Sequence, residues 1–343
     1  MKKYILLIYV CFIQHLLFAQ VKDNTSTIFD NDSNIEKWLK ENKVPVLGIG
    51  TIKDGKLNQI KVFGNSYNTI FNVASLTKPV TAIIALKLVE QGKLDLDEPL
   101  YKYWTDPDIA KDPRNKKITT RFILSHQTGF KNWRWLNDDK KLGFDFDPGK
   151  GYQYSGEGYE YLRKALENKF KKPLQQLAEE LIFQPLKMHD TKYIWDKNID
   201  VSRYAMNFDQ NGNTYEIVKN TTANAADDLL TTIEDYGNFL TNIMNGNMLS
   251  EKIFKEMTTP QTASEKGKYF GLGFEIYDFG KEEYVLAHGG ADEGVRAIVF
   301  IVPKTKQGLL IFTNSDTGGS LYETLVKHYL GEYGKKIIDL EMK

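Results

Sequence analysis

The β-prone segments of this 343-residue chain stand at its two ends, and helical patterns fill the stretch between them. Residues 46–53 and 57–64 are two such runs near the start, and the Asp54-Gly55 pair between them is typical of a tight hairpin turn. Strand-like runs return in the last third of the chain, at 269–279, 283–288, 295–302 and 308–314. This distribution predicts an α/β fold of the α+β type, in which one antiparallel sheet is built from both chain ends and flanked by helices.

Helical periodicity is found between the two groups of strand-like runs and once after the second group. Residues 78–90 form a helix by pattern, since Pro79 is tolerated in a first turn and Gly92 follows the end. Further helices are expected at 162–186, 227–245 and 321–330. We therefore expect a sheet lobe made of about 36–74 and 265–343, and a mostly helical second lobe at about 95–255.

The composition excludes several classes of protein. The chain has 45 Lys+Arg against 45 Asp+Glu, and this zero formal charge disfavours nucleic acid as a partner, which requires a basic excess. Hydrophobic residues make up 41%, which excludes intrinsic disorder. Cys11 is the only cysteine and the histidines are scattered without metal-ligand spacing, so we expect neither an intrachain disulfide nor a bound metal.

Residues 1–19 have the pattern of a secretory signal peptide. Two lysines precede a mostly apolar stretch at 4–18, and Ala19 offers a small residue for cleavage. The alternative is an uncleaved anchor, although polar residues at 14 and 15 leave the apolar run short for a membrane span. We expect a mature domain of residues 20–343 that is periplasmic or secreted and retains no membrane span.

Ser75 and Lys78 form an S-x-x-K pattern at the start of the helix expected at 78–90. Positions i and i+3 share one face of a helix, so the hydroxyl and the amine would be neighbours, as a serine nucleophile and its proton acceptor must be. Backbone N–H groups at a helix start also favour developing negative charge. The alternative is that Ser75 is only a helix cap, because serine often fills that role.

A second segment, Tyr154-Ser155-Gly156, precedes the start of a helix. A tyrosine acts as a base only if its phenolate is stabilised, and a nearby ammonium such as that of Lys78 would do so. The alternative is a packed aromatic loop residue.

The third segment, His288-Gly289-Gly290-Ala291, lies in a strand-like run. The glycines would let a substrate approach the strand backbone, and the Ala291 N–H would serve as an oxyanion donor. The alternative is a glycine-rich strand end with an exposed histidine.

Taken in this order, the three segments resemble the serine β-lactamase and penicillin-binding protein superfamily, and in particular its class C β-lactamase-related, peptidase S12-like branch. Residues 123–130 resemble the branch's leucine-serine-histidine-threonine-glycine segment, and residues 90–99 resemble the stretch that follows its nucleophile helix. The resemblance covers about 36–335.

The resemblance implies hydrolysis of an amide or ester through an acyl-serine. Ser75 would be the nucleophile, Lys78 and Tyr154 would share its proton, and His288 would shape the field around the leaving group. The N–H groups of Ser75 and Ala291 would form the oxyanion hole, and no cofactor is required. Which of Lys78 and Tyr154 holds the proton at rest is left open, because two groups this close titrate together.

The sequence departs from the family pattern at Gly156, where an asparagine often stands. This departure predicts weak or absent β-lactam turnover, and we consider whether the neighbouring Glu157 supplies a polar group instead. D-peptidase or carboxypeptidase action and carboxylesterase action on a small or peptide substrate are both compatible with the motifs. The alternative is a non-catalytic binder of peptidoglycan peptides or a similar ligand on the same fold. The oligomeric state is not assigned.

Two further substrate contacts are considered. Arg296 follows the glycine-rich strand by a turn and would meet a substrate carboxylate, or else form a surface salt bridge. Trp133, Trp135 and Phe144 precede Tyr154 and would either line an acyl pocket or pack inside the helical lobe. His126 is interpreted as a structural residue that holds backbone groups in its own turn.

Overall fold

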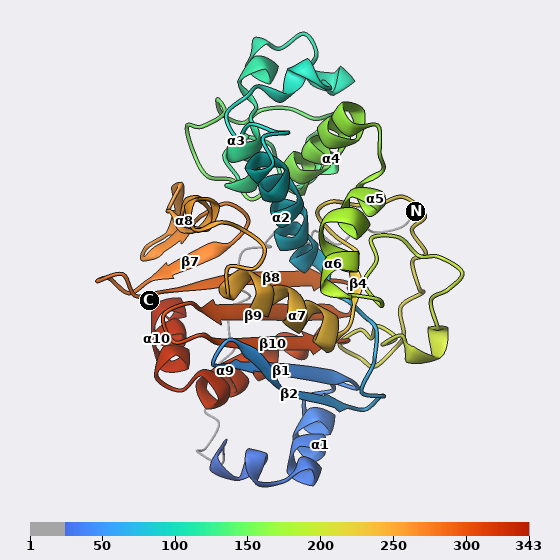
Figure 1. The fold of residues 1–343 in the computed structure, drawn as a ribbon. Helices are drawn as coiled ribbons and strands as arrows, with labels where there is room; N and C mark the ends of the chain where they lie inside the picture. Colours follow the sequence, from blue (N-terminus) through green and yellow to red (C-terminus); the bar gives the residue numbers. More distant parts are fainter. Residues whose placement is uncertain (1–24, 343) are drawn as a thin grey trace.

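A computed structural model describes residues 25–342 of the chain (Figure 1). The predicted signal peptide at 1–19 lies outside the described residues. Among the helices of 25–342, none combines the length and the apolar character that are needed to cross a bilayer.

The centre of the described structure is one antiparallel sheet of eight strands, in the order β2-β1-β10-β9-β8-β7-β6-β5. The N-terminal and C-terminal parts of the chain meet inside this sheet, since β1 pairs with β10 from Leu47↔Thr313 to Ile52↔Gly308. The expectation of one sheet built from both chain ends is therefore confirmed. The strands are β1 (Leu47–Lys53), β2 (Lys56–Phe63), β5 (Thr262–Glu265), β6 (Lys268–Phe270), β7 (Glu275–Asp278), β8 (Tyr284–Asp292), β9 (Val295–Val302) and β10 (Gln307–Thr313).

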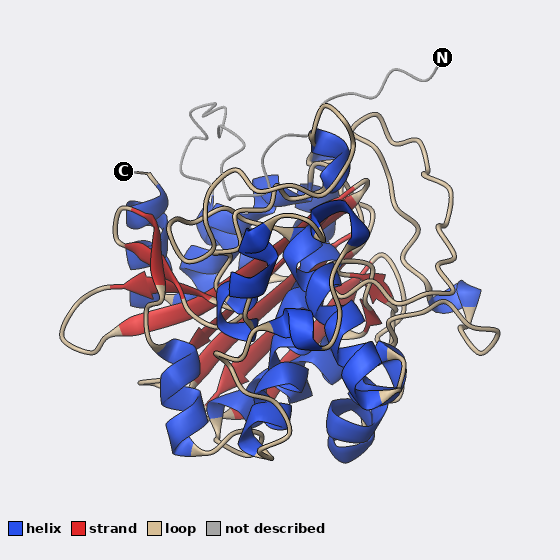
Figure 2. Cartoon of the chain, turned by 90° about the horizontal axis from the view of Figure 1, so that it is seen from above, coloured by secondary structure: helices blue, strands red, loops and turns tan. Residues whose placement is uncertain are grey.

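Helices cover both faces of this sheet, as the view from above shows (Figure 2). Three terminal helices pack on one face, where Ile35, Leu325 and Ile337 meet strand residues such as Ile49 and Ile298. They are α1 (Asp32–Glu41), α9 (Tyr322–Leu330) and α10 (Glu332–Glu341). The opposite face carries α2 (Thr77–Glu90), α7 (Ile233–Met244) and the helical part of the chain above them (Figure 1).

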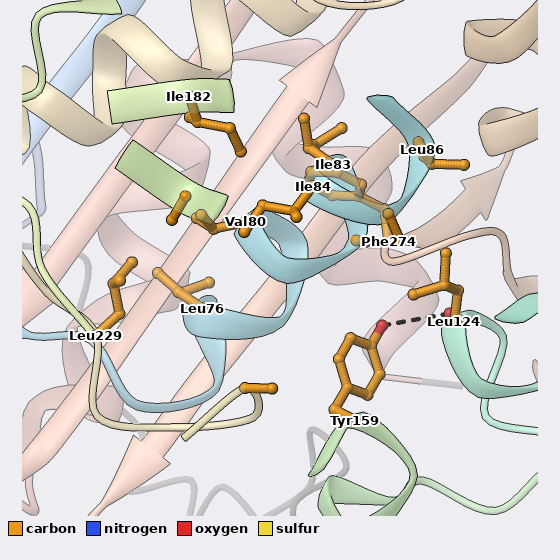
Figure 3. Packing of buried hydrophobic residues seen from close by; sticks show 14 of the residues in the cluster. Leu76, Val80, Ile83, Ile84, Leu86, Leu124, Tyr159, Ile182, Leu229 and Phe274 are labelled. Carbon is orange, nitrogen blue, oxygen red and sulfur yellow. Dashed lines mark hydrogen bonds between the residues drawn. The ribbon is translucent and has the colours of Figure 1, made fainter. Parts of the chain in front are cut away.

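The helix α2 is the axis of the second core. Its residues from Thr77 to Leu86 are all buried, which is why the segment is apolar on every side. Val80, Ile83 and Ile84 lie among side chains from several other elements, including Ile182 and Phe274 (Figure 3). The surrounding helices are α3 (Thr120–Leu124), α4 (Gly156–Phe170), α5 (Leu174–Ala178), α6 (Gln184–Leu186) and α8 (Glu251–Thr258).

The structure corrects several predicted element boundaries. The single helix expected at 162–186 is broken, because Lys171 ends α4 in a left-handed conformation (φ 55°) and Pro173 caps α5, after which a π-helical turn follows. The run at 269–279 is split into β6 and β7 around Gly273, whose φ of 95° is not compatible with a straight strand. Residues 227–231 precede α7 and include a short strand, β4 (Leu230–Thr231), which pairs with β3 (Phe71–Asn72).

Helix α7 lies on the sheet and packs into the same core as α2. Ile233 is so close to β1 that side chains at Gly48 and Gly50 would overlap it. The predicted helical lobe at 95–255 therefore includes an element that covers β1 and β2.

Strand β8 and the 3₁₀ turn η2 (Ala74–Leu76) approach each other closely at Gly290. A Cβ atom there would overlap the carbonyl oxygen of Val73 and lie 3.2 Å from the backbone nitrogen of Ser75. Only glycine permits this approach, because each of these neighbours is backbone and cannot rotate away.

We predict that Gly290→Ala destabilises the protein by about 1–3 kcal/mol, the usual cost of forcing an extra methyl group into a packed contact. The measurement is the free energy of unfolding in urea. Gly143→Ala is the matched control, since a Cβ at that position meets nothing within 4 Å and should change the stability by less than about 1 kcal/mol. Equal stability of the two variants would contradict the close approach.

Candidate active site

The S-x-x-K pattern forms a hydrogen-bonded pair in the structure. Ser75 is in the turn η2, and Lys78 is in the first turn of α2. The Lys78 Nζ donates to Ser75 Oγ at 2.9 Å and to the carbonyl oxygen of Ala226 at 2.8 Å. Since Lys78 is completely buried, these contacts fix the amine beside the hydroxyl. The pair has the geometry of a nucleophile and its proton acceptor.

Burial lowers the pKa of Lys78 from its usual 10.5 to about 7. The cause is the loss of hydration of the charged form, and it outweighs the opposing effect of the nearby Asp227 and Glu160 carboxylates. A large fraction of the amines is therefore neutral near pH 7, as an amine that accepts a proton from a serine must be.

The turn that presents Ser75 is held in a strained conformation. Ala74 has a φ of 46°, in the left-handed region that non-glycine residues rarely adopt. The Ala74 N–H donates to Asn72 Oδ1 at 2.8 Å, and the Thr77 hydroxyl donates to the Ala74 carbonyl at 2.6 Å. These bonds fix the backbone of the turn on both sides of Ala74, immediately before Ser75.

Tyr154 lies next to the Lys78 amine, with 4.7 Å between Nζ and the centre of the ring. Its segment is fixed by His126, whose Nδ1 accepts a hydrogen bond from the Ser155 N–H at 3.1 Å. The imidazole of His126 also lies against the Tyr154 ring, with 4.2 Å between centroids. His126 therefore positions the tyrosine segment as well as its own turn, a contact that the sequence did not reveal.

His288 faces the same cluster from β8, 6.2 Å from the Tyr154 ring between centroids. Its Nδ1 lies 2.7 Å from the Gly289 carbonyl oxygen, which can only accept, so Nδ1 carries the proton. Burial, and then the charge of Lys78, lower the pKa of His288 to about 3. The ring is consequently neutral, and its buried Nε2 is an acceptor without a hydrogen-bond partner within residues 25–342.

The end of β8 that contains Gly290 and Ala291 has one open edge. β7 pairs with β8 only from Tyr284 to Ala287, whereas β9 pairs with it as far as Asp292. Beyond Ala287 the β8 backbone therefore approaches η2 and, within residues 25–342, has no strand partner on the side away from β9, where an extended ligand could pair with it. Ser75, Lys78, Tyr154, His288 and Gly290 are brought together, and Gly289 and Ala291 flank Gly290 on the strand.

Arg296 is placed away from this cluster. Side chains alternate along β9, and those of Ile298 and Phe300 belong to the core on the face opposite α2. The Arg296 Nη1 donates to the Asp292 and Val295 carbonyls, both at 2.7 Å, and Nη2 lies 3.5 Å from Asp316. The guanidinium is thus held on the far side of the sheet and does not face Ser75.

Glu157 does not replace the side chain that is absent at Gly156. It is buried and forms an ion pair with Arg134 at 2.8 Å between Oε2 and Nη2, and Arg134 also pairs with Asp106 at 2.9 Å. The carboxylate therefore anchors the preceding loop. The Gly156 N–H is bound too, donating to Asn132 Oδ1 at 2.8 Å.

Three carboxylates beside the cluster of Ser75, Lys78 and Tyr154 were not predicted. Oxygen atoms of Asp227, Asp228 and Asp292 lie within 4.8 Å of one another, and loss of hydration raises the pKa of each, although Asp292 lies at the surface. Asp227 directly follows Ala226, whose carbonyl binds Lys78, and Asp292 directly follows Ala291. An adjacent Asp pair inside the apolar stretch 225–230 is the sequence signal that could have indicated them.

A pocket extends from these carboxylates along the strand β4. Its wall contains acidic and aromatic side chains, and no lysine or arginine lines it within the described residues. Asn72 connects the pocket to the nucleophile turn, because its Nδ2 donates to Asp228 at 3.3 Å while its Oδ1 binds Ala74. The charged and aromatic wall residues are Tyr193, Trp195, Tyr204, Tyr215, Glu216, Asp228, Asp292 and Glu293.

Comparisons with solved structures show the fold that this chain shares with other proteins. An octameric penicillin-binding protein homologue from Pyrococcus abyssi superimposes with a TM-score of 0.75 at 23% identity, over 89% of this chain and 77% of that one. A D-stereospecific amidohydrolase from Streptomyces sp. gives a TM-score of 0.73 at 20% identity, over 86% of this chain and 96% of that one. The D-amino acid amidase of Ochrobactrum anthropi SV3 gives 0.69 at 24% identity, over 82% and 92%.

Among curated sequences, Protein flp of Staphylococcus aureus strain MW2 is 23% identical over 315 residues, which are 82% of this chain. The match spans only 62% of the length of that relative. A beta-lactamase family profile matches residues 31–327, nearly the whole described chain. The chain therefore belongs to the beta-lactamase family.

Proposed function

We propose that this chain is a periplasmic or secreted amidohydrolase that cleaves the amide bond of a D-amino-acid amide or peptide through an acyl-Ser75 intermediate. The observation that carries the proposal is the 2.9 Å hydrogen bond between the Ser75 hydroxyl and a buried lysine amine. The signal pattern at 1–19 supports the location, and the D-specific amidohydrolase and amidase among the structural neighbours support the substrate class.

The proposed reaction begins when neutral Lys78 takes the Ser75 proton as Oγ attacks the amide carbon. The negative oxygen would be held by the N–H groups of Ser75 and Ala291, next to the open edge of β8. Collapse of this intermediate breaks the C–N bond, and the leaving amine takes the proton from Lys78 through Tyr154. A water molecule then repeats the attack on the acyl-serine and releases the acid.

The charges around the cleft favour an aminopeptidase-like or amidase-like substrate over a carboxypeptidase-like one. A carboxypeptidase must bind a substrate carboxylate, but Arg296 is held on the other face of the sheet. Asp227 and Asp292 instead offer carboxyl groups beside Ser75 and Lys78, which a bound ammonium group would hold in the charged form, and the aromatic pocket wall suits a cation. The free α-ammonium of an amino-acid amide would satisfy these carboxylates.

We predict that a fluorophosphonate probe labels the folded protein at one position, Ser75, and that Ser75→Ala removes the label and lowers amide turnover by about 10⁴-fold or more. Mass mapping of the labelled peptide is the measurement. Ser125→Ala is a control, because the Ser125 hydroxyl is buried and donates to the Arg121 carbonyl and not to Lys78. A folded protein without any label would favour the non-catalytic binder.

We predict that kcat/KM increases with pH through an apparent pKa near 7 and then reaches a plateau. The pKa of Lys78 is lowered to about 7, so below this pH the amine is protonated and cannot accept the serine proton. The measurement is a pH–rate profile between pH 5 and pH 9, roughly two units on each side. A decrease of kcat/KM above pH 7 would instead assign the base to Tyr154, with Lys78 acting as a cation.

Asp227→Asn provides the internal control for this profile. The Asp227 carboxylate raises the pKa of Lys78, so its removal should move the rising limb to lower pH. An unmoved limb would show that another group controls the profile.

We predict that substrates with a free α-ammonium are preferred over their N-acetylated forms by about tenfold or more in kcat/KM. A tenfold ratio corresponds to about 1.4 kcal/mol, which we assign to one charged contact. The measurement compares D-amino-acid p-nitroanilides with their acetylated forms, and Asp292→Asn should reduce the preference. Faster cleavage of an acetylated D-Ala-D-Ala peptide would support the carboxypeptidase interpretation. Faster cleavage of p-nitrophenyl esters alone would support an esterase.

A further inference from the structure

Gly156 has no space for a side chain, because an indole ring already occupies it. A Cβ atom at this position would lie 2.7, 2.9 and 3.0 Å from the Cη2, Cζ2 and Cζ3 atoms of Trp133. Even an alanine would therefore displace the indole, and the asparagine of the resembling family pattern would not fit. The absence of a side chain at 156 and the presence of Trp133 are two parts of one arrangement.

The loop that carries Trp133 is fixed to the start of α4. The Gly156 N–H donates to Asn132 Oδ1 at 2.8 Å, and the Glu157 N–H donates to the Asn132 carbonyl at 2.9 Å. In the opposite direction, the Arg134 N–H donates to Glu157 Oε1 at 3.0 Å. These bonds bracket Trp133 on both sides, so its indole has a defined position over Gly156.

The indole lies beside the segment that carries Tyr154. Position 156, over which the Trp133 ring lies, is two residues after Tyr154, and the Tyr154 ring lies 4.7 Å from the Lys78 amine. The Ser155 hydroxyl between these two positions is turned to the Lys131 carbonyl at 3.0 Å. The indole therefore adjoins the tyrosine segment of the cluster.

A second indole extends this aromatic surface toward solvent. Trp135 stacks on Trp133 with 4.9 Å between ring centroids and an interplanar angle of 10°. Trp135 is 58% exposed, so its ring does not fill the core. Phe144, the third aromatic residue considered for the acyl pocket, instead packs against Phe130 in the helical core, with 4.8 Å between ring centroids.

We propose that Trp133 and its stacked neighbour Trp135 form the aromatic wall of the acyl-binding side of the cleft, and select substrates whose acyl group carries a flat aromatic side chain. The wall stands where a polar side chain at 156 would otherwise meet the acyl group. Ring stacking is worth about 0.5–1.5 kcal/mol beyond the burial of apolar area. The inference rests on the proposed acyl-serine chemistry, and it names the substrate class of that site.

The test compares two probes that differ only in the group that would meet the wall, a benzyl and a methyl fluorophosphonate. Both react in the same way: the Ser75 Oγ–P bond forms, the P–F bond breaks, fluoride leaves, and the serine proton passes to Lys78. The measured quantity is the ratio of the second-order labelling rates, benzyl to methyl. No knowledge of the natural substrate is needed.

We expect Trp133→Leu to lower this ratio by about tenfold, the effect of losing one stacked ring contact with its buried area. Trp38→Leu is the matched control, since Trp38 is a half-buried tryptophan on the opposite face of the sheet, beside Phe29. An unchanged ratio in Trp133→Leu would overturn the proposed wall while leaving the serine chemistry intact. Failure of both probes to label the folded wild-type protein would instead overturn the proposed function.

A double-mutant comparison tests the geometry separately. Gly156→Ala should lower both the urea midpoint and the benzyl-to-methyl ratio, because the added methyl group displaces the indole. In a Trp133→Ala background the same substitution should leave the urea midpoint unchanged, since the space is then open. Equal effects of Gly156→Ala in the two backgrounds would overturn the proposal.

Discussion

A buried lysine amine is the interaction on which the rest of this site depends. Lys78 has lost its hydration, so its charge is stabilised only by what the fold supplies, and the result is a pKa near 7 rather than near 10. Three separate elements supply its surroundings: the Ser75 turn, the Ala226 carbonyl and the Tyr154 segment. If any of these moved away, the amine would regain water or lose its contact with the nucleophile.

The convergence of these elements depends on the absence of side chains at two points. Gly290 lets β8 lie against the nucleophile turn, where its neighbours are backbone atoms that cannot rotate away. Gly156 lets an indole lie against the start of α4, where its neighbour is a side chain held by its own loop. The first glycine is thus required by the close approach of β8 to the turn that holds Ser75, while the second is coupled to a tryptophan and concerns the substrate that we propose.

Short-range patterns in the sequence were sufficient to predict much of the fold. The Asp54-Gly55 hairpin, the buried helix after Ser75 and the strands β9 and β10 are as predicted, since each is encoded within a short segment. The neighbourhood of Ser75 and Lys78 also follows from helical spacing. The prediction of one helix at 162–186 was wrong, because the chain leaves the helix at Lys171 and starts a new one after Pro173. Pro173 is a local signal for such a break, but the prediction gave more weight to the helical periodicity.

The sequence by itself indicated the residues that we propose to carry the chemistry, because serine, amine, phenol and glycine-rich strand can each be recognised within a few positions. The tertiary structure decided which charges and rings surround them. It placed Arg296 on the far face of the sheet, brought Asp227 and Asp292 together from positions 65 residues apart, and set Trp133 over Gly156. Those outcomes depend on strand register and loop anchoring, which are properties of long-range packing that no single segment encodes.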